Sequence, residues 1–185
     1  MIDPPTIVKT AATRAAIVHL TIPKAAIQKE MGPGIAEVRA ALAAQDIEAT
    51  GPWFTRHYKM DPEVWDFDIG VPVAKPVAPP GRVQDGELPA ATVARTIYHG
   101  GYEGLAGAWP KLDAWIAEQG RTGAASLWET YLVDPVRQSR PRGLADGALP
   151  SARRAVGGCR RRAASAALTK RKPESPFVIA SKRFL

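Results

Sequence analysis

A carboxylic acid and a phenol lie two residues apart in the segment Trp128-Glu129-Thr130-Tyr131-Leu132-Val133-Asp134-Pro135. The segment reads as a short strand, because it is rich in aromatic and β-branched residues and ends at an Asp-Pro turn signal. Side chains alternate between the two faces of a strand, so Glu129 and Tyr131 share a face. A carboxylate among aromatic rings can attract a cation, and a desolvated one can act as a general acid. The same alternation is also typical of a solvated strand surface, so the surrounding elements must decide between the two.

The first half of the chain predicts one strand-helix-strand-strand unit. The residue pattern indicates a strand over 14–22, a helix whose apolar stripe spans 27–42, and strands over 53–58 and 64–73. We expect Gly32-Pro33-Gly34 to break or kink the helix. This order of elements is a βαββ unit.

The second half repeats the pattern but stops short. A strand over 88–98, a helix over 102–119 and a strand over 128–133 follow in the same order. Beyond them the sequence is rich in Arg, Ala, Gly and Pro and shows no sustained periodicity. The chain therefore predicts an α+β fold built from a duplicated βαββ unit, with the last strand missing or replaced. The domain would span residues 6–135, and residues 136–185 would form a basic, disordered tail.

The charge of the chain is divided unevenly. The whole sequence carries a net charge of +7, yet residues 1–138 hold 13 basic and 16 acidic residues, whereas residues 139–185 hold 12 basic and 2 acidic ones. The basic character therefore belongs to the tail. Nucleic acid is an expected partner only through that tail.

The remaining composition argues against disulfides, metal sites and membrane insertion. Cys159 is the single cysteine, and His19, His57 and His99 are scattered through the chain. We therefore expect no disulfide, no bound metal and no cofactor. The sequence has no apolar run long enough to span a membrane and no secretion signal at its start, so we expect a cytoplasmic protein without a membrane partner.

Six short motifs follow one another between residues 6 and 135. They are Gly51-Pro52-x-Phe54-x-x-x-Tyr58, Phe67-Asp68-x-Gly70-Val71-Pro72-Val73, Leu88-Pro89-Ala90, His99-Gly100-x-Tyr102-x-x-Leu105, Leu112-x-x-Trp115-Ile116 and Trp128-Glu129-x-Tyr131. In this order and spacing they resemble the GyrI-like domains, also described as the effector-binding domains of AraC-type and multidrug-sensing activators.

The resemblance implies two βαββ modules related by a pseudo-twofold axis. It further implies an antiparallel sheet with two helices on one side and a central groove for bulky cationic or aromatic molecules. Family members place a groove carboxylate at the position that Glu129 matches. The ligand-binding residues expected on this basis are Glu129, Tyr131, Tyr58, Phe54 and Tyr102. Trp109 and Trp115 lie on the apolar stripe of the second helix, so we expect them to be core residues.

The sequence leaves three functions open. The first is a stand-alone domain that senses or sequesters cationic or aromatic, drug-like small molecules; no helix-turn-helix precedes Thr6, so we do not expect a DNA-binding activator. The resemblance also admits a hydrolase of cyclopropane-containing electrophilic toxins, with Glu129 as acid or water activator and Tyr131 assisting. The third is nucleic-acid binding through the basic tail.

The tail lacks the ending that the resemblance implies. Family members close the second module with a strand of the pattern Trp-Arg-Thr-Glu-Leu-Tyr-x-Pro. Codons can be chosen for residues 136–153 so that the frame one base later encodes Trp-Arg-Thr-Glu-Leu-Tyr-Arg-Pro. We therefore hypothesise that the tail arises from a frameshift, and the nucleotide sequence across codons 134–153 tests this. Without the last strand, the neighbouring strand would expose an edge and invite pairing with a second chain, as in a dimer.

Overall fold

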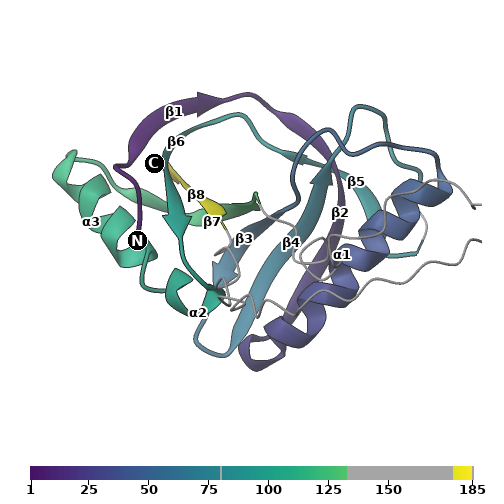
Figure 1. Ribbon diagram of the computed structural model, residues 1–185, viewed down its shortest axis with the longest axis horizontal. Helices are drawn as coiled ribbons and strands as arrows, with labels where there is room; N and C mark the ends of the chain where they lie inside the picture. Colours follow the sequence, from purple (N-terminus) through teal and green to yellow (C-terminus); the bar gives the residue numbers. More distant parts are fainter. Residues whose placement is uncertain (80, 133–176, 185) are drawn as a thin grey trace, which may run out of the picture.

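The computed structural model describes residues 1–79, 81–132 and 177–184. Within them, one antiparallel sheet combines eight strands, and the helices lie against it (Figure 1). In chain order the elements are β1 (Thr6–Thr10), β2 (Thr13–Pro23), the 3-10 helix η1 (Lys24–Ala26), α1 (Ile27–Ala44), β3 (Phe54–Met60), β4 (Val64–Pro72), β5 (Val83–Leu88), β6 (Ala91–His99), α2 (Tyr102–Leu105), α3 (Trp109–Glu118), β7 (Gly123–Tyr131) and β8 (Phe177–Phe184). No helix in this part of the chain is both long and apolar enough to cross a membrane.

The strand order confirms the duplication predicted from the sequence. It runs β1-β6-β8-β7-β3-β4-β2-β5, with neighbouring strands antiparallel. One half is β6-β8-β7, the other half is β3-β4-β2 in the reverse order, and the halves meet where β7 pairs with β3. Each unit is preceded by a short strand that pairs with the other unit. β1 precedes β2 in the chain but pairs with β6, whereas β5 precedes β6 but pairs with β2. Two βαββ units are thus related by a pseudo-twofold axis between β7 and β3.

Both main helices cover the same face of the sheet. Ile69, Thr55 and Glu129 are register partners across β4, β3 and β7, so their side chains point to one face. On this face α1 brings Gly34 against Ile69, and α3 brings Trp109 to Glu129. We call this the helix face and the opposite one the outer face.

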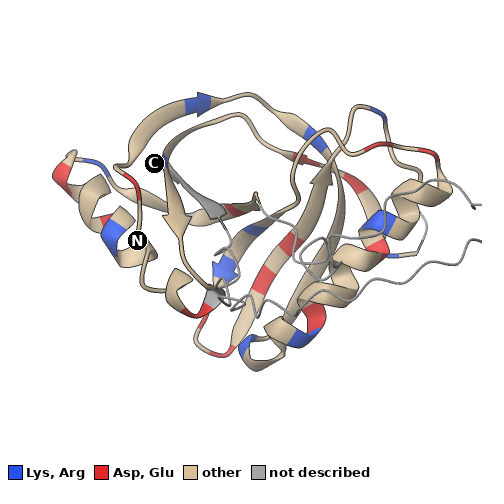
Figure 2. Cartoon of the chain, in the orientation of Figure 1, with Lys and Arg blue, Asp and Glu red and all other residues tan. Residues whose placement is uncertain are grey.

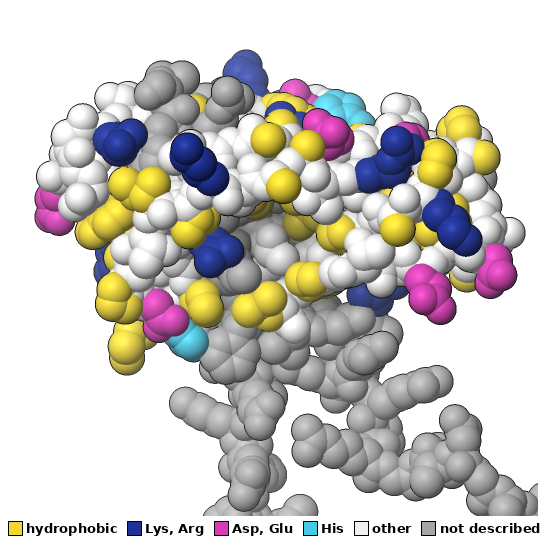
Figure 3. All heavy atoms as spheres, turned by 90° about the horizontal axis from the view of Figure 1, so that it is seen from above, with side chains coloured by type: hydrophobic (Ala, Val, Ile, Leu, Met, Phe, Trp, Pro, Cys, Tyr) yellow, Lys and Arg dark blue, Asp and Glu magenta, His cyan; other side chains and the backbone are white. Residues whose placement is uncertain are grey.

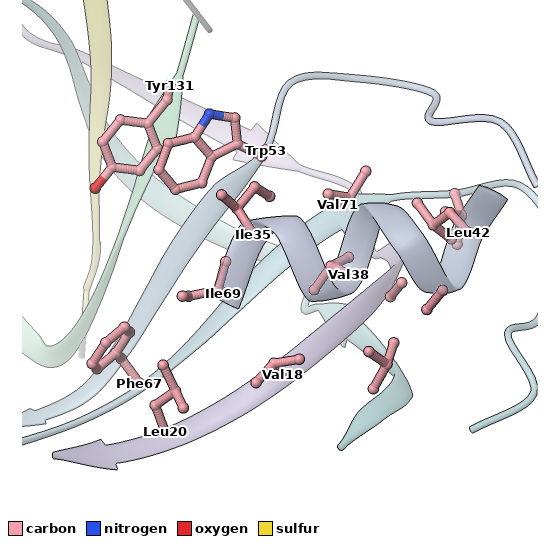
Figure 4. Close-up of a cluster of buried hydrophobic side chains, with 14 of the residues drawn as sticks. Val18, Leu20, Ile35, Val38, Leu42, Trp53, Phe67, Ile69, Val71 and Tyr131 are labelled. Carbon is pink, nitrogen blue, oxygen red and sulfur yellow. The ribbon is translucent and has the colours of Figure 1, made fainter. Parts of the chain in front are cut away.

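The larger hydrophobic core packs α1 against β2 and β4 (Figure 4). Its buried side chains include Val18, Leu20, Ile35, Val38, Leu42, Phe67, Ile69 and Val71. The same core continues to Trp53 and Tyr131, next to the junction of the two units. A smaller core joins α3 to β6, and Trp109 and Trp115 pack against it, as expected for residues of the apolar stripe.

Three local features differ from the sequence predictions. α1 is one helix through Gly32-Pro33-Gly34, where a break or kink is predicted. A Cβ on Gly34 would lie 2.5 Å from the Ile69 Cδ1 atom, so this glycine serves the close packing of α1 on β4 and does not end the helix. The predicted strand over 88–98 is preceded by a separate strand, β5, because Pro89 cannot donate to a sheet. The predicted helix over 102–119 is divided into α2 and α3.

β8 occupies the position of the last strand, which the sequence predicts to be missing or replaced. It lies between β6 and β7, as β4 lies between β2 and β3 in the first unit. The last strand is therefore replaced by residues 177–184, and the edge of β7 that we expected to be exposed is paired, so the argument for a dimer through that edge is wrong. The frameshift hypothesis concerns residues 136–153, which lie outside the described residues, as does most of the basic tail.

Candidate functional site

Glu129 lies near the middle of the sheet on the helix face. β7 pairs with β3 on one side and with β8 on the other, which places Glu129 opposite Thr55 and Ala180. Its chain neighbours Trp128 and Thr130 point to the outer face, because side chains alternate along a strand. Glu129 is only 8% exposed, so it is not part of a solvated strand surface.

Each oxygen of the Glu129 carboxylate accepts one hydrogen bond. Trp109 Nε1 donates to Oε1 over 3.0 Å, and the Tyr131 hydroxyl donates to Oε2 over 2.6 Å. Burial raises the pKa of Glu129, because a charged group loses its hydration there, and the two hydrogen bonds partly offset that rise. The site therefore holds an acid whose charge is disfavoured by burial and supported by two donors.

Tyr131 is held between an indole ring and a second hydroxyl group. Its ring stacks on Trp53, with ring centroids 3.9 Å apart and planes inclined by 10°, and the two rings lie side by side in Figure 4. Its hydroxyl oxygen is 3.3 Å from Thr55 Oγ1 on β3. Since Tyr131 is 4% exposed, stacking and hydrogen bonding fix where its hydroxyl lies relative to Glu129.

His57 extends this hydrogen-bonded series away from Glu129. Its Nε2 atom is 3.1 Å from Thr55 Oγ1, while its ring stacks on Phe67 and meets Trp65 edge-on. Burial lowers the pKa of His57 to about 4, because the imidazolium would lose its hydration among these rings. His57 is therefore neutral near pH 7.

The structure does not bring Phe54 or Tyr58 to Glu129. Phe54 is opposite Thr130 and Gly70, so it belongs to the outer face. Its ring covers Gly70 so closely that a Cβ at that position would overlap the ring of Phe54. Tyr102 is the first residue of α2, and its side chain lies outside what the structure describes.

Tyr58 belongs to a polar cluster on the outer face, where acidic residues lie along β4 (Figure 2). Its hydroxyl donates to Asp68, and the ring nitrogens of His19 lie 2.8 Å from Asp68 and 3.0 Å from Asp66. Burial raises the pKa of Tyr58 to about 12, and the hydrogen bond to Asp68 is the second largest cause of the rise. These residues line a shallow hollow of about 400 Å³ with Ile17 and Gln84.

A second hollow is visible when the molecule is seen from above (Figure 3). It lies near the middle of that face, and hydrophobic side chains lie along much of its rim, with a basic side chain beside them. As to metals, the described residues contain no group of three or more His, Cys, Asp or Glu side chains that could hold an ion.

Comparison with protein families decides the identity of this fold. The model of the GyrI-like small molecule binding domain matches residues 3–142, which is most of the chain. The chain belongs to this family. A comparison with curated proteins finds no match for this GyrI-like chain.

Solved structures show the same fold at low sequence identity. The C-terminal domain of EcmrR is 15% identical, with a TM-score of 0.67 over 98% of this chain and 97% of that one. The EcmrR chain in its complex with DNA is 14% identical, with a TM-score of 0.67 over 97% of this chain, and this GyrI-like chain spans 57% of its length. A hydrolase from Listeria innocua is 11% identical, with a TM-score of 0.56 over 98% of this chain and 91% of that one. SAV2435 bound to tetraphenylphosphonium is 8% identical, with a TM-score of 0.52 over 98% of this chain and 94% of that one.

Three residues of this GyrI-like site were missed by sequence reasoning. Trp109 was expected to be a core residue, and its indole does pack against the smaller core, but its N–H reaches Glu129. Thr55 and His57 lie between Phe54 and Tyr58, the two residues of this strand that are predicted from the sequence to bind the ligand. Alternation along the strand indicates that Thr55 and His57 share a face. That this is the face of the site follows only from the pairing of Thr55 with Glu129.

Proposed function

We propose that this GyrI-like domain binds a bulky organic cation with an aromatic surface, and that Glu129 is the counter-charge for that cation. In this role the protein acts as a cytoplasmic sensor or sequestering protein for such compounds. The proposal rests on one observation above all: the buried carboxylate of Glu129 has no basic ion-pair partner among the described residues. The two donors offset only part of the cost of burying the charge, since the pKa of Glu129 stays raised, so a bound cation would complete the site.

Aromatic neighbours strengthen the proposal. Trp109 contacts the carboxylate directly, and Tyr131 stacks on Trp53 beside it. Ring faces attract cations, and the attraction grows when water is excluded. SAV2435, which shares the fold, binds tetraphenylphosphonium, so the same cation is a suitable probe.

Replacing Glu129 by Gln tests the counter-charge. We expect the affinity for tetraphenylphosphonium, measured by isothermal titration calorimetry, to fall by about 10-fold or more, because a charge-assisted contact is lost. The same substitution should keep or raise the melting temperature near pH 7, because it removes a buried charge. Glu118→Gln, at an exposed position of α3, is the matched control and should leave the affinity unchanged. Equal affinities for wild type and Glu129→Gln would refute the proposal.

Replacing Trp109 by Phe tests the indole donor. This change keeps an aromatic ring but removes the N–H that supports the carboxylate. We expect the affinity for tetraphenylphosphonium to fall by about 2- to 10-fold at pH 7. Trp115→Phe on the same helix packs against the same core and is the control for altered packing. A loss of affinity of the same size in both variants would assign the effect to packing.

A second candidate function is hydrolysis of cyclopropane-containing electrophiles. The observation that favours it is the raised pKa of Glu129 together with the 2.6 Å contact from the Tyr131 hydroxyl, since a desolvated acid beside a phenol can donate a proton to a substrate. A turnover assay with wild type, Glu129→Gln and Tyr131→Phe separates the two functions. Turnover that Glu129→Gln abolishes supports hydrolysis, whereas binding of tetraphenylphosphonium without turnover supports the sensor.

A further inference from the structure

The hydrogen bonds around Glu129 have a defined direction. An ionised carboxylate can only accept, so the proton of the Tyr131 hydroxyl points to Oε2. The Tyr131 oxygen then accepts the proton of the Thr55 hydroxyl, 3.3 Å away. Because that proton is already used, the Thr55 oxygen must accept from Nε2 of His57. His57, Thr55 and Tyr131 therefore donate in one direction, toward the acid.

The surroundings of His57 give independent support for this direction. Its Nδ1 atom is buried and has no hydrogen-bond partner in the described part of the chain. A neutral imidazole carries its proton on only one nitrogen, and a buried N–H without an acceptor is costly. The tautomer with the proton on Nε2 avoids that cost, because Thr55 accepts the proton.

We propose that His57 and Thr55 are positioning residues, which through a one-way hydrogen-bond relay to Tyr131 hold Glu129 in the anionic form that binds the cation. The proposal rests on the cation-binding function proposed above, and it adds two residues beyond Trp109 and Tyr131, the two that donate hydrogen bonds to Glu129. The titratable groups of the relay are His57, Tyr131 and Glu129. Asp66, Asp68 and His19 lie at outer-face positions, and the neighbours of the His57 ring on β4 are Phe67 and Trp65.

The relay also has a reversed state. If Glu129 takes up a proton, it can donate to Tyr131, which then donates to Thr55, which donates to His57 Nε2. The proton of His57 must then lie on Nδ1, which has no acceptor among the described residues. The apolar surroundings of Nδ1 therefore disfavour the reversed state, and with it the neutral form of Glu129 that donates to Tyr131. A bound cation favours the same forward state.

The tautomer of His57 in the full chain is the direct test. Long-range proton-nitrogen correlation spectra of 15N-labelled protein distinguish the two ring nitrogens without any ligand. We expect the proton on Nε2 at pH 7. A proton on Nδ1 at that pH would overturn the relay, whether or not the protein binds a cation.

Variants of the two relay residues test its effect on binding. The affinity for tetraphenylphosphonium is measured from pH 5 to 8, and the midpoint is the pH at which half of its change with pH has occurred. Thr55→Val should raise this midpoint by about 0.5 to 1 pH unit, because the hydroxyl that donates to Tyr131 is lost. Thr55→Ser keeps the hydroxyl and should leave the midpoint in place. His57→Gln, whose amide can occupy the place of Nε2, should also keep the midpoint, whereas the shorter His57→Asn should raise it.

The outcomes separate the relay from the function that it supports. An unchanged midpoint in Thr55→Val, with binding that still depends on Glu129, would overturn the relay and leave the cation site intact. Binding that is indifferent to Glu129→Gln would remove the cation site, while the tautomer of His57 would still report on the relay. Melting curves of each variant identify any that fail to fold, and for those the tautomer in the wild type decides.

Discussion

Replacing Phe54 by Ala is expected to lower the free energy of unfolding by about 3–5 kcal/mol, as is usual when a buried phenylalanine is removed. Phe54 is 1% exposed, and its ring rests on Gly70 of the neighbouring strand. Because it points to the face opposite Glu129, the folded variant should bind tetraphenylphosphonium as the wild type does. Urea unfolding and calorimetric binding, both at pH 7 and below the melting temperature, measure the two quantities.

A milder substitution controls for partial unfolding. Phe54→Leu keeps most of the apolar volume and should lose less stability than Phe54→Ala, again without loss of affinity. The opposite result, a stable Phe54→Ala variant with weakened binding, would return Phe54 to the ligand site, where the sequence analysis put it. A loss of stability without a loss of affinity thus identifies Phe54 as a packing residue, and the reverse would identify it as a ligand contact.

The case of Phe54 shows what alternation along a strand can and cannot predict. Alternation correctly predicts that Glu129 and Tyr131 share a face, because both lie on one strand. It does not predict which face of β3 joins them, because that depends on the register between β3 and β7. The observed register sets Thr55, not Phe54, opposite Glu129. A shift of one residue in the pairing register would turn every side chain of the strand to the opposite face. The position of Phe54 in a motif therefore does not predict which face it lies on.

Long-range pairing also explains the other differences. β7 and β8 are neighbours in the sheet but far apart in sequence, and no local pattern connects residues 123–131 with residues 177–184. The apolar, β-branched sequence of Phe177-Val178-Ile179-Ala180 agrees with a strand, but it follows a basic segment that favours a tail. Trp109 was correctly placed on an apolar stripe, and periodicity cannot show that its N–H finds a carboxylate on another element. The duplication, in contrast, was readable because each unit repeats locally.

Acid is expected to destabilise the protein through His57. Burial holds the pKa of His57 near 4 in the folded chain, against 6.5 as its ordinary value, so between these two values the unfolded chain binds a proton that the folded chain does not. The free energy of unfolding should therefore fall as the pH is lowered from 6.5 to 4, by up to about 3 kcal/mol. Urea unfolding at pH 7 and at pH 4.5 measures the loss.

Glu129 acts with the opposite sign, which is why a matched set of variants is needed. Its raised pKa means that the folded chain binds a proton more readily than the unfolded one, so protonation of Glu129 stabilises the fold as the pH falls through that pKa. In Glu129→Gln the acid-induced loss should therefore be larger than in wild type, and in His57→Gln it should be smaller by about 2–3 kcal/mol. If His57→Gln loses as much stability in acid as the wild type, the imidazole is not neutral in the folded chain, and the argument from the His57 tautomer for the direction of the hydrogen bonds loses its basis.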